Sequence, residues 1–306
     1  MSRTRFATMI LAVAGVGMMA VGGGPAVGAE PSPPSGVQYV ALGDSYASGF
    51  GIDPYTTTPA AGCFQSEQSY PHQVAAALGL ELTDVSCAGA VTANIIDTPQ
   101  TTIDGSAIVA PQSDALTVDT DIVTVMIGGN DLGFSTILPT CVALAADGPL
   151  LVNPAQPNCK DDPTYGANQL LATVNGVVVP ALDATLNKIS EKAPHAKVFV
   201  IGYPTIFPDA ANTPAGGCFT AAIDPDTLQP TGENKYPFTD VDVPYLNTVA
   251  AALDTATASL AAAHGATFVP NQPGTAAHSP CGSTPGTSVD TNMLPNKIES
   301  PTPGAG

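Results

Sequence analysis

The chain has 306 residues, enough for one large domain with a full hydrophobic core, and its formal net charge is −18. A surface this acidic repels the phosphate backbone of nucleic acids, so nucleic-acid binding is excluded from the expected functions. The six cysteines form no C-x-x-C pair and the four histidines are scattered. We therefore expect neither a metal site nor another cofactor.

The first 29 residues are predicted to be a secretory signal peptide. Arg3 and Arg5 precede an apolar stretch from residue 6 to about residue 21, and Ala29 ends a run of small residues that suits cleavage. Residues 30–36 then read as a disordered leader. We expect a secreted, extracellular protein with three disulfides and, because no later apolar run reaches roughly 18 residues, no membrane span.

Short apolar runs alternate with helical patterns along the rest of the chain. The predicted strands cover residues 37–42, 122–127, 197–201 and 267–269. The predicted helices cover residues 70–78, 168–192 and 245–264. We expect Pro180 to kink the second helix and Gly265 to cap the third. Strands alternating with helices predict one domain of α/β class, with a mainly parallel sheet covered on both faces.

Two long irregular segments interrupt this alternation, at residues 132–166 and 205–243. The first holds Cys141 and Cys159, and the second holds Cys218. Loops of this length in a compact domain are usually functional or cross-linked, so we expect them to form walls around a cleft. The tail, residues 282–306, is rich in Pro, Gly, Ser and Thr and is predicted to be disordered.

A candidate nucleophile follows the first strand in "ALGDSYASGFG". Ser45 lies where a helix would begin, which presents its own backbone N–H beside its hydroxyl. A serine nucleophile also needs a base and donors for the oxyanion. Gly89 in "SCAGAV" and Asn130 in "IGGND" could donate. Each motif alone is an ordinary turn signal, but their order and their places after strands make the combination more specific.

The same motifs carry a resemblance to a known family. From "YVALGDSYASGFG" through "DVSCAGAVTANI", "DIVTVMIGGNDLGF" and "KVFVIGYP" to "GATFVP", the sequence resembles the SGNH (GDSL) hydrolases, in particular their secreted actinobacterial esterase and lipase branch. The resemblance implies a flavodoxin-like three-layer α/β/α sandwich over residues 37–281. It implies Ser45 as nucleophile, an oxyanion hole made by Ser45, Gly89 and Asn130, and disulfides Cys63–Cys87, Cys141–Cys159 and Cys218–Cys281.

One departure from the family concerns the general base. Family members carry an Asp-x-x-His block near the carboxyl end, whereas this chain reads "SVDTNMLPNKIESPTPGAG" without a histidine. Either that end of the sequence is altered or another residue serves. His278 in "TAAHSPCG" is the expected substitute, because Cys281 could anchor it at the cleft wall. Asp290 is the available carboxylate partner.

These observations predict a monomeric serine esterase or lipase that acts on a small-molecule or lipid ester. The alternative is a protein of the same fold that lacks its catalytic base and binds an acyl or glycan ligand without turnover. The sequence does not specify the ester or its acyl length.

Overall fold

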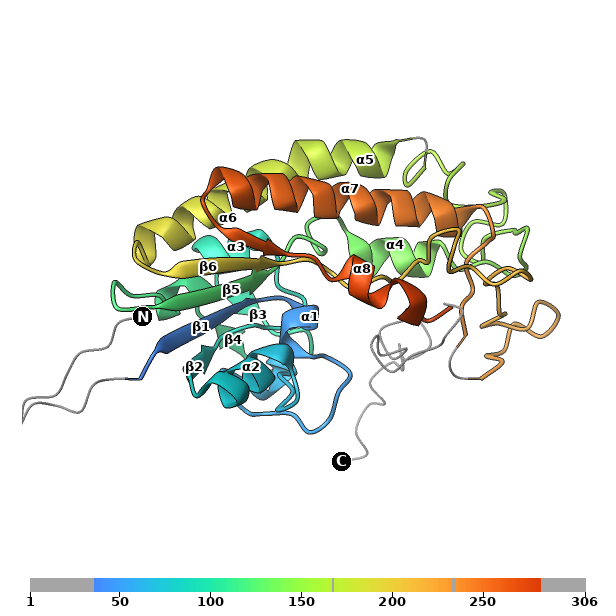
Figure 1. The fold of residues 1–306 in the computed structure, drawn as a ribbon. Helices are drawn as coiled ribbons and strands as arrows, with labels where there is room; N and C mark the ends of the chain where they lie inside the picture. The colour runs from blue at the N-terminus through green and yellow to red at the C-terminus, as the bar shows by residue number, and fades with distance from the viewer. Residues whose placement is uncertain (1–35, 167, 233–234, 282–306) are drawn as a thin grey trace, which may run out of the picture. The chain divides into compact units, whose positions relative to one another are not determined.

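A computed structural model describes residues 36–166, 168–232 and 235–281. The predicted signal peptide, all but the last residue of the leader, and the tail from residue 282 lie outside these ranges. The helices are α1 (Ser45–Ser48), α2 (Tyr70–Leu78), α3 (Thr92–Ile96), α4 (Phe134–Thr140), α5 (Gln169–Thr173), α6 (Val179–Lys192), α7 (Asp242–Ala263) and α8 (Gln272–Thr275). Figure 1 shows their arrangement around a central sheet.

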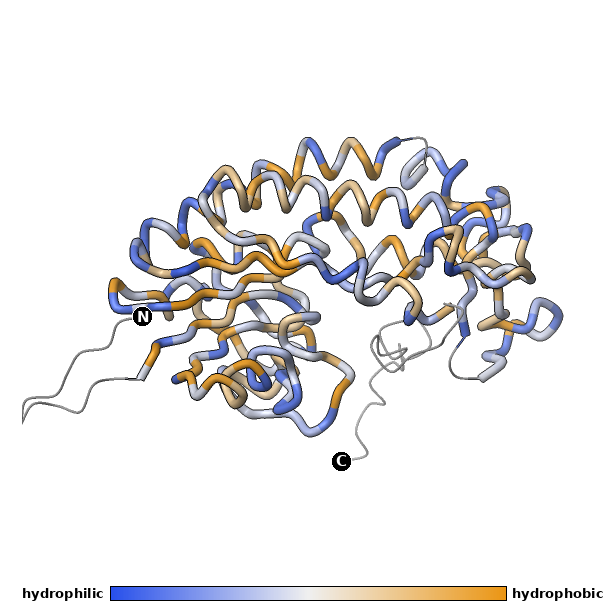
Figure 2. The backbone as a smooth tube through the Cα atoms, viewed as in Figure 1, coloured by the Kyte–Doolittle hydropathy of each residue, from blue (hydrophilic) through white to orange (hydrophobic). Residues whose placement is uncertain are grey.

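The central sheet contains five strands in the order β2-β1-β5-β6-β7, and every neighbouring pair is parallel. They are β1 (Gln38–Gly43), β2 (Glu81–Asp84), β5 (Ile122–Met126), β6 (Lys197–Ile201) and β7 (Thr267–Val269). The predicted α/β class with a mainly parallel sheet is confirmed. Figure 2 shows the middle strands as hydrophobic segments, as expected for strands covered on both faces.

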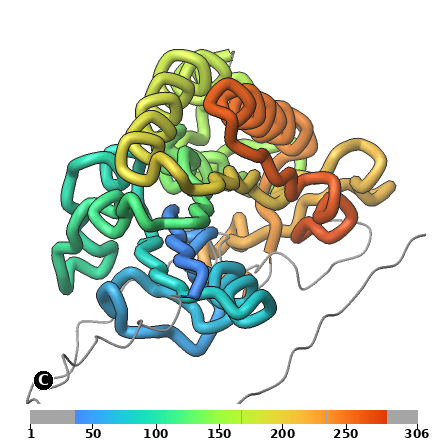
Figure 3. The backbone as a smooth tube through the Cα atoms, turned by 60° about the vertical axis from the view of Figure 1, so that its left-hand side comes forward, coloured from blue at the N-terminus to red at the C-terminus, as the bar shows by residue number. Residues whose placement is uncertain are grey.

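The two faces of the sheet carry different helices, which makes three layers. Along β1, Tyr39 and Ala41 pack with Ala75 of α2 on one face. Val40 and Leu42 point to the other face, into the large core shared with α3, α6 and α7. Figure 3 shows α6 and α7 side by side over that face. Because neighbouring strands are parallel, the carboxyl ends of β1, β5 and β6 meet at one edge of the sheet.

The long predicted helix 168–192 consists of α5, a π-helical turn over Val174–Val178, and α6. Pro180 lies in the first turn of α6, and the N–H of Val179 bonds to the carbonyl of Val174. Proline has no N–H to donate to the carbonyl four residues earlier, and the helix widens to a π-helical turn just before it. The kink expected at Pro180 stays a prediction.

This helical stretch is the one part of the described chain that bears on the expectation that no later apolar run reaches the length of a membrane span. Gln169–Lys192 has 24 residues and is long and apolar enough by length and composition. Its inward face is buried in the core, at Leu170, Val174, Val178 and Leu182. On the face that packs against a sheet, a core helix is as apolar as a membrane-spanning helix, so composition alone does not distinguish the two.

The last long helix begins three residues earlier than predicted, at Asp242. The buried Asp242 carboxylate accepts the N–H groups of Cys159 (3.0 Å) and Lys160 (2.8 Å), so it fixes the preceding loop to α7. Gly265 follows the helix with φ +68°, and Gly265 N–H and Ala266 N–H bond to Ala262 and Ala261. This is the Schellman termination that the glycine predicted.

Disulfides connect Cys63–Cys87, Cys141–Cys159 and Cys218–Cys281, and no cysteine is free. The three pairings implied by the family resemblance are confirmed. The segment 132–166 is more ordered than predicted, because α4 and a β-bridge between Ala143 and Leu150 lie within it. The sequence did not predict α4, because Pro139 and the turn-forming residues around it are not typical of a helix.

Strands β2, β3 and β4 were also not predicted from the sequence. The edge strand β2 alternates exposed and half-buried residues in "ELTD", and the hairpin β3 (Gln100–Thr101) and β4 (Ile108–Val109) has only two residues a side. Short strands with exposed polar residues do not produce a clear apolar run.

Candidate active site

Gly43 ends β1 in a conformation that admits only glycine. Its φ is +148°, and a Cβ atom there would lie 2.4 Å from the carbonyl oxygen of Met126. The buried side-chain amide of Gln112 pairs with the Gly43 backbone, accepting its N–H at 2.7 Å and donating to its carbonyl at 2.9 Å. Strand β1 therefore ends at a defined position immediately before the candidate nucleophile.

Ser45 is the first residue of α1, as the sequence predicted. Asp44 caps this helix by accepting the N–H of Tyr46 at 3.0 Å, and Gly49 ends it in the left-handed region. In the part of the chain that the structure describes, neither the Ser45 hydroxyl nor its N–H has a hydrogen-bond partner. Half-buried at a strand end, Ser45 can offer both groups to a ligand.

Gly89 lies in the loop after β2, with φ +82° and an exposed backbone. Cys87 N–H bonds to the Gly43 carbonyl at 3.0 Å, and Gln100 Nε2 bonds to the Ala88 carbonyl at 2.8 Å. These bonds hold the loop against the end of β1. The Gly89 N–H finds no acceptor within the described ranges, and a Cβ atom on Gly89 would approach Ile103 to 2.5 Å.

Asn130 follows β5 and reaches the same loop. Its Nδ2 donates to the carbonyl of Ala90 at 2.9 Å, so its side chain contacts the residue that follows Gly89 in the chain. The next residue, Asp131, accepts the N–H of Thr92 at 3.0 Å and so joins this turn to the start of α3. Ser45 and Asn130 both line one pocket. Gly89 is not among the lining residues, but the next residue, Ala90, is bonded to Asn130.

A tyrosine that the sequence analysis did not single out joins two of these loops. Tyr203 follows β6, donates its hydroxyl hydrogen to Asp44 Oδ2, and accepts the N–H of Gly129 at 3.0 Å. Burial raises the pKa of Asp44 to about 7, against the opposing effect of the Tyr203 hydrogen bond. The "IGYP" match contained Tyr203, but nothing in its spacing indicated these partners.

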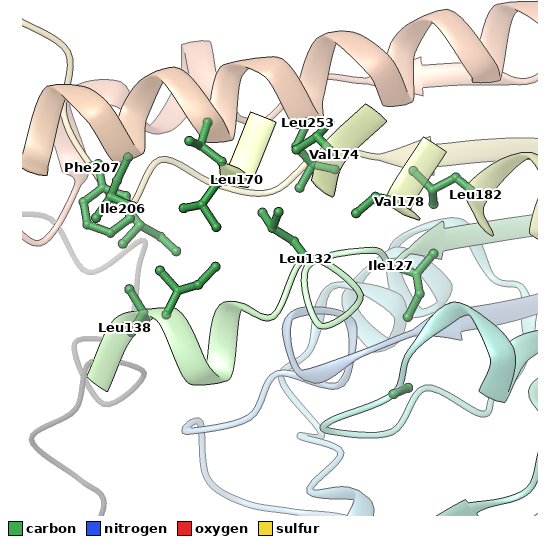
Figure 4. Close-up of a cluster of buried hydrophobic side chains, with 14 of the residues drawn as sticks. Ile127, Leu132, Leu138, Leu170, Val174, Val178, Leu182, Ile206, Phe207 and Leu253 are labelled. Carbon is green, nitrogen blue, oxygen red and sulfur yellow. The ribbon is translucent and has the colours of Figure 1, made fainter. Parts of the chain in front are cut away.

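The pocket beside Ser45 is mostly apolar. It encloses an empty volume of about 890 Å³, part of which is open to solvent. Figure 4 shows Leu132, Leu138, Leu170, Ile206 and Phe207 gathered between α4 and α7. Leu132 and Leu138 come from the segment 132–166, Ile206 and Phe207 from the segment 205–243, and Leu170 from α5. Such a pocket suits a hydrocarbon chain better than a sugar, because few polar groups face it.

No histidine is among the described residues that line this pocket. His278 ends a 3-10 turn (Ala276–His278) after α8; it is half-buried and makes no hydrogen bond or ion pair within the described part of the chain. His264 bonds to Asp183 at 2.7 Å, and His72 bonds to Ser69 at 2.9 Å. His195 is exposed. Asp290, the predicted carboxylate partner, lies outside the described residues.

Nor do the described residues include a group of three His, Cys, Asp or Glu side chains that could hold a metal ion. The polar groups that line the pocket include the Ser45 hydroxyl, the Asn130 amide, Asp44 and Tyr203.

Comparisons with known proteins agree with this arrangement. A model of the GDSL-like lipase/acylhydrolase family matches residues 41–292. Lipase 2 of Streptomyces coelicolor is 36% identical over 265 residues, which is 85% of this chain and 79% of that protein. An esterase of Streptomyces scabiei is 32% identical over 278 residues, covering 84% and 76%.

Two solved structures share the fold. The extracellular lipase of Streptomyces rimosus superposes with a TM-score of 0.57 at 25% identity, covering 85% of this chain and 90% of its own. The phospholipase A1 of Streptomyces albidoflavus superposes with a TM-score of 0.55 at 26% identity, covering 80% and 84%.

Proposed function

The chain belongs to the GDSL-like lipase/acylhydrolase family, and from this we propose that it is a secreted serine esterase or lipase that hydrolyses carboxylic esters through an acyl-enzyme on Ser45. The observation that carries the proposal is the Ser45 hydroxyl, unpartnered among the described residues, on the wall of an apolar pocket that Asn130 also lines. Lipase and esterase relatives support an ester as the substrate.

In the first step a base takes the hydroxyl proton of Ser45 while Oγ forms a bond to the ester carbonyl carbon. The C=O electron pair moves to the oxygen. When the tetrahedral intermediate collapses, the alcohol leaves with the proton returned by the base, and the acyl group stays on Ser45. Water then repeats the sequence, releasing the carboxylic acid and restoring the hydroxyl.

The oxyanion would be stabilised by the N–H groups of Ser45 and Gly89 and by the side-chain amide of Asn130. The two backbone groups have no acceptor in the described part of the chain, so no bond must be broken before they bind a ligand. One Nδ2 hydrogen of Asn130 is held by Ala90, which leaves the second available. Fixed donors of this kind supply a large part of the catalysis of acyl transfer.

His278 is the proposed base. It lies on the segment after β7, where Gln272 lines the pocket and Thr275 Oγ1 accepts the N–H of Thr205 at 2.8 Å. The Cys218–Cys281 disulfide anchors the same segment three residues beyond His278. These contacts tie the segment to one side of the pocket.

A lipid ester is the substrate class that the pocket supports best, with a short ester as the simplest assay substrate. Leu, Ile, Val and Phe side chains dominate its lining, and burying each CH₂ of an acyl chain there is worth about 0.8 kcal/mol. The relatives described as lipases and a phospholipase agree with this class. We propose that the secreted protein acts as a monomer.

A second candidate function is binding of an acyl ligand without turnover. It is favoured by one observation, namely that none of the four histidines is among the described pocket-lining residues. In that case Ser45 would contact the ligand without becoming acylated.

Hydrolysis of p-nitrophenyl butyrate by the purified protein separates these functions. We expect turnover, and we expect Ser45→Ala to abolish it with the melting temperature unchanged. Ser190→Ala is the matched control, because the Ser190 hydroxyl donates to Leu186 within α6, away from the pocket. Turnover that survives Ser45→Ala would exclude Ser45 as nucleophile, and binding without turnover would favour the second function.

A further inference from the structure

We infer that Tyr203 is a positioning residue, whose hydroxyl holds the loop before Ser45 and the loop before Asn130 in one fixed relation for ester hydrolysis. This inference rests on the proposed function, since it assigns Tyr203 a role in the geometry of that reaction. Tyr203 itself contributes no proton to the steps described above.

The geometry of one oxygen atom carries the inference. The Tyr203 hydroxyl donates to Oδ2 of Asp44, the residue immediately before Ser45. The same oxygen accepts the N–H of Gly129 at 3.0 Å, and Gly129 immediately precedes Asn130. A single atom thus bonds to the neighbour of the proposed nucleophile and to the neighbour of a proposed oxyanion donor.

Both partners depend on this hydroxyl. Asp44 is 2% exposed, and its other oxygen, Oδ1, is occupied by the N–H of Tyr46. Among the described residues, Tyr203 is the only hydrogen-bond partner of Oδ2, and the only acceptor of Gly129 N–H. Removing the hydroxyl would leave a buried carboxylate oxygen and a backbone N–H unpaired, so both loops would shift to find new partners.

The packing around Tyr203 keeps its oxygen in place. Its ring meets the ring of Tyr46 edge to face, with centroids 5.2 Å apart. A Cβ atom on Gly129 would lie 3.1 Å from the Tyr203 hydroxyl, tighter than an ordinary contact, so the absence of a side chain at Gly129 allows the close approach. The ring therefore has little freedom to follow if either loop moves.

The reaction is more sensitive to this geometry than binding is. Tyr203 itself lines the pocket, but most of the lining that would hold the acyl chain consists of apolar side chains of α4, α5 and α7. The oxyanion, in contrast, must meet donors at hydrogen-bond distance as it forms, and a displacement of about 1 Å can cost about 10²-fold in rate. We therefore expect kcat to depend on the Tyr203 hydroxyl and KM to be nearly independent of it.

Tyr203→Phe removes the oxygen and keeps the ring. We expect kcat for p-nitrophenyl butyrate to fall between about tenfold and about 10²-fold, with KM changed less than about twofold. The matched control is Tyr39→Phe. The Tyr39 hydroxyl is also buried and bonds to Thr124 Oγ1 at 2.8 Å, but it lies on the face of the sheet covered by α2. That control should keep its kcat while losing a comparable hydrogen bond.

A double variant tests whether the effect passes through Asn130. If Tyr203 acts by placing Asn130, Tyr203→Phe should lower kcat much less in an Asn130→Ala background than in the parent. Amide hydrogen exchange provides a readout independent of turnover. Gly129 N–H should be protected in the parent and in Tyr39→Phe, and should exchange faster in Tyr203→Phe.

Four results would overturn the inference. They are an unchanged kcat in Tyr203→Phe, an equal loss of kcat in Tyr39→Phe, fully additive effects in the double variant, and fast exchange of Gly129 N–H in the parent, which needs no variant to fold. In each of these the proposed function stands if the parent hydrolyses the ester and Ser45→Ala does not. A folded parent without turnover would overturn the proposed function and this inference together.

Discussion

The side-chain amide of Asn130 donates to the main-chain carbonyl of Ala90 at 2.9 Å. This bond joins the turn after β5 to the loop after β2, two segments that are 40 residues apart in the chain. Because Ala90 follows Gly89, the bond also joins two of the proposed oxyanion donors. Asn130 is therefore both a structural link and a candidate donor, and experiments must separate these roles.

Asn130→Ala tests the donor role. We expect kcat to fall by about 10² to 10³ with a smaller change in KM, as when one oxyanion donor is removed from other enzymes. Asn187→Ala, which loses only an exposed contact to Asp183, is the control for a lost amide. An effect confined to KM would instead make Asn130 a contact of the bound substrate, and a large drop in melting temperature would point to its link with Ala90.

Alanine replacement of each histidine tests the identity of the base. The chain contains four histidines, so the series is exhaustive. We expect only His278→Ala to lose the chemical step, by several orders of magnitude as when a catalytic base is removed. His264→Ala should lower stability and leave kcat unchanged, because the 2.7 Å contact of His264 with Asp183 joins the residue after α7 to α6. Full activity in all four variants would show that histidine is not the base.

The disulfides predict the thiol content and the effect of reduction. Mass spectrometry of the unreduced protein should find no free thiol, because all six cysteines are paired. Reduction should lower the free energy of unfolding, and the loss of one native bridge typically costs about 2 to 5 kcal/mol. Cys218→Ser with Cys281→Ser should have the largest effect, because that bridge spans 63 residues. One titratable thiol per folded molecule would contradict the pairing.

Asp44 predicts how stability changes with pH. Burial raises the pKa of Asp44 from 3.8 to about 7, so between these values the folded state binds a proton that the unfolded state has lost. This group therefore stabilises the fold at low pH, and its contribution, on the order of 4 kcal/mol, disappears as pH rises from about 4 to about 7.

The corresponding measurement compares the parent with Asp44→Asn by urea unfolding at pH 4, 5.5 and 7. The parent should lose more free energy of unfolding across this range than the variant. Asp84, whose pKa burial raises to about 6, changes stability in the same direction in both proteins and cancels in the difference. Equal slopes for the two proteins would show that Asp44 remains ionised in the folded state.

Part of the fold could be predicted from local patterns. Strands β6 and β7 and helix α2 have the predicted bounds, and Gly265 ends α7 as expected. These elements are short runs rich in β-branched and aromatic residues or an amphipathic helix, and such patterns are visible in neighbouring residues of the sequence. The edge strand β2 and the hairpin of β3 with β4 were missed, because their pairing depends on neighbours from elsewhere in the chain.

The candidate site divides in the same way. Ser45, Gly89 and Asn130 could be proposed from motifs at strand ends, because the carboxyl ends of parallel strands meet at one edge of a sheet. The position of His278 and the partners of Tyr203 could not, since both depend on loops whose course the disulfides and side-chain packing determine.

By itself, the sequence determined the α/β class, most of the regular elements and the family motifs, because periodicity and turn chemistry act over neighbouring residues. Only the tertiary structure decided that a hydroxyl from the end of β6 bonds to Asp44 and Gly129, and that an apolar pocket opens beside Ser45. Those relationships join segments more than 70 residues apart, which come together when the sheet and its helices pack.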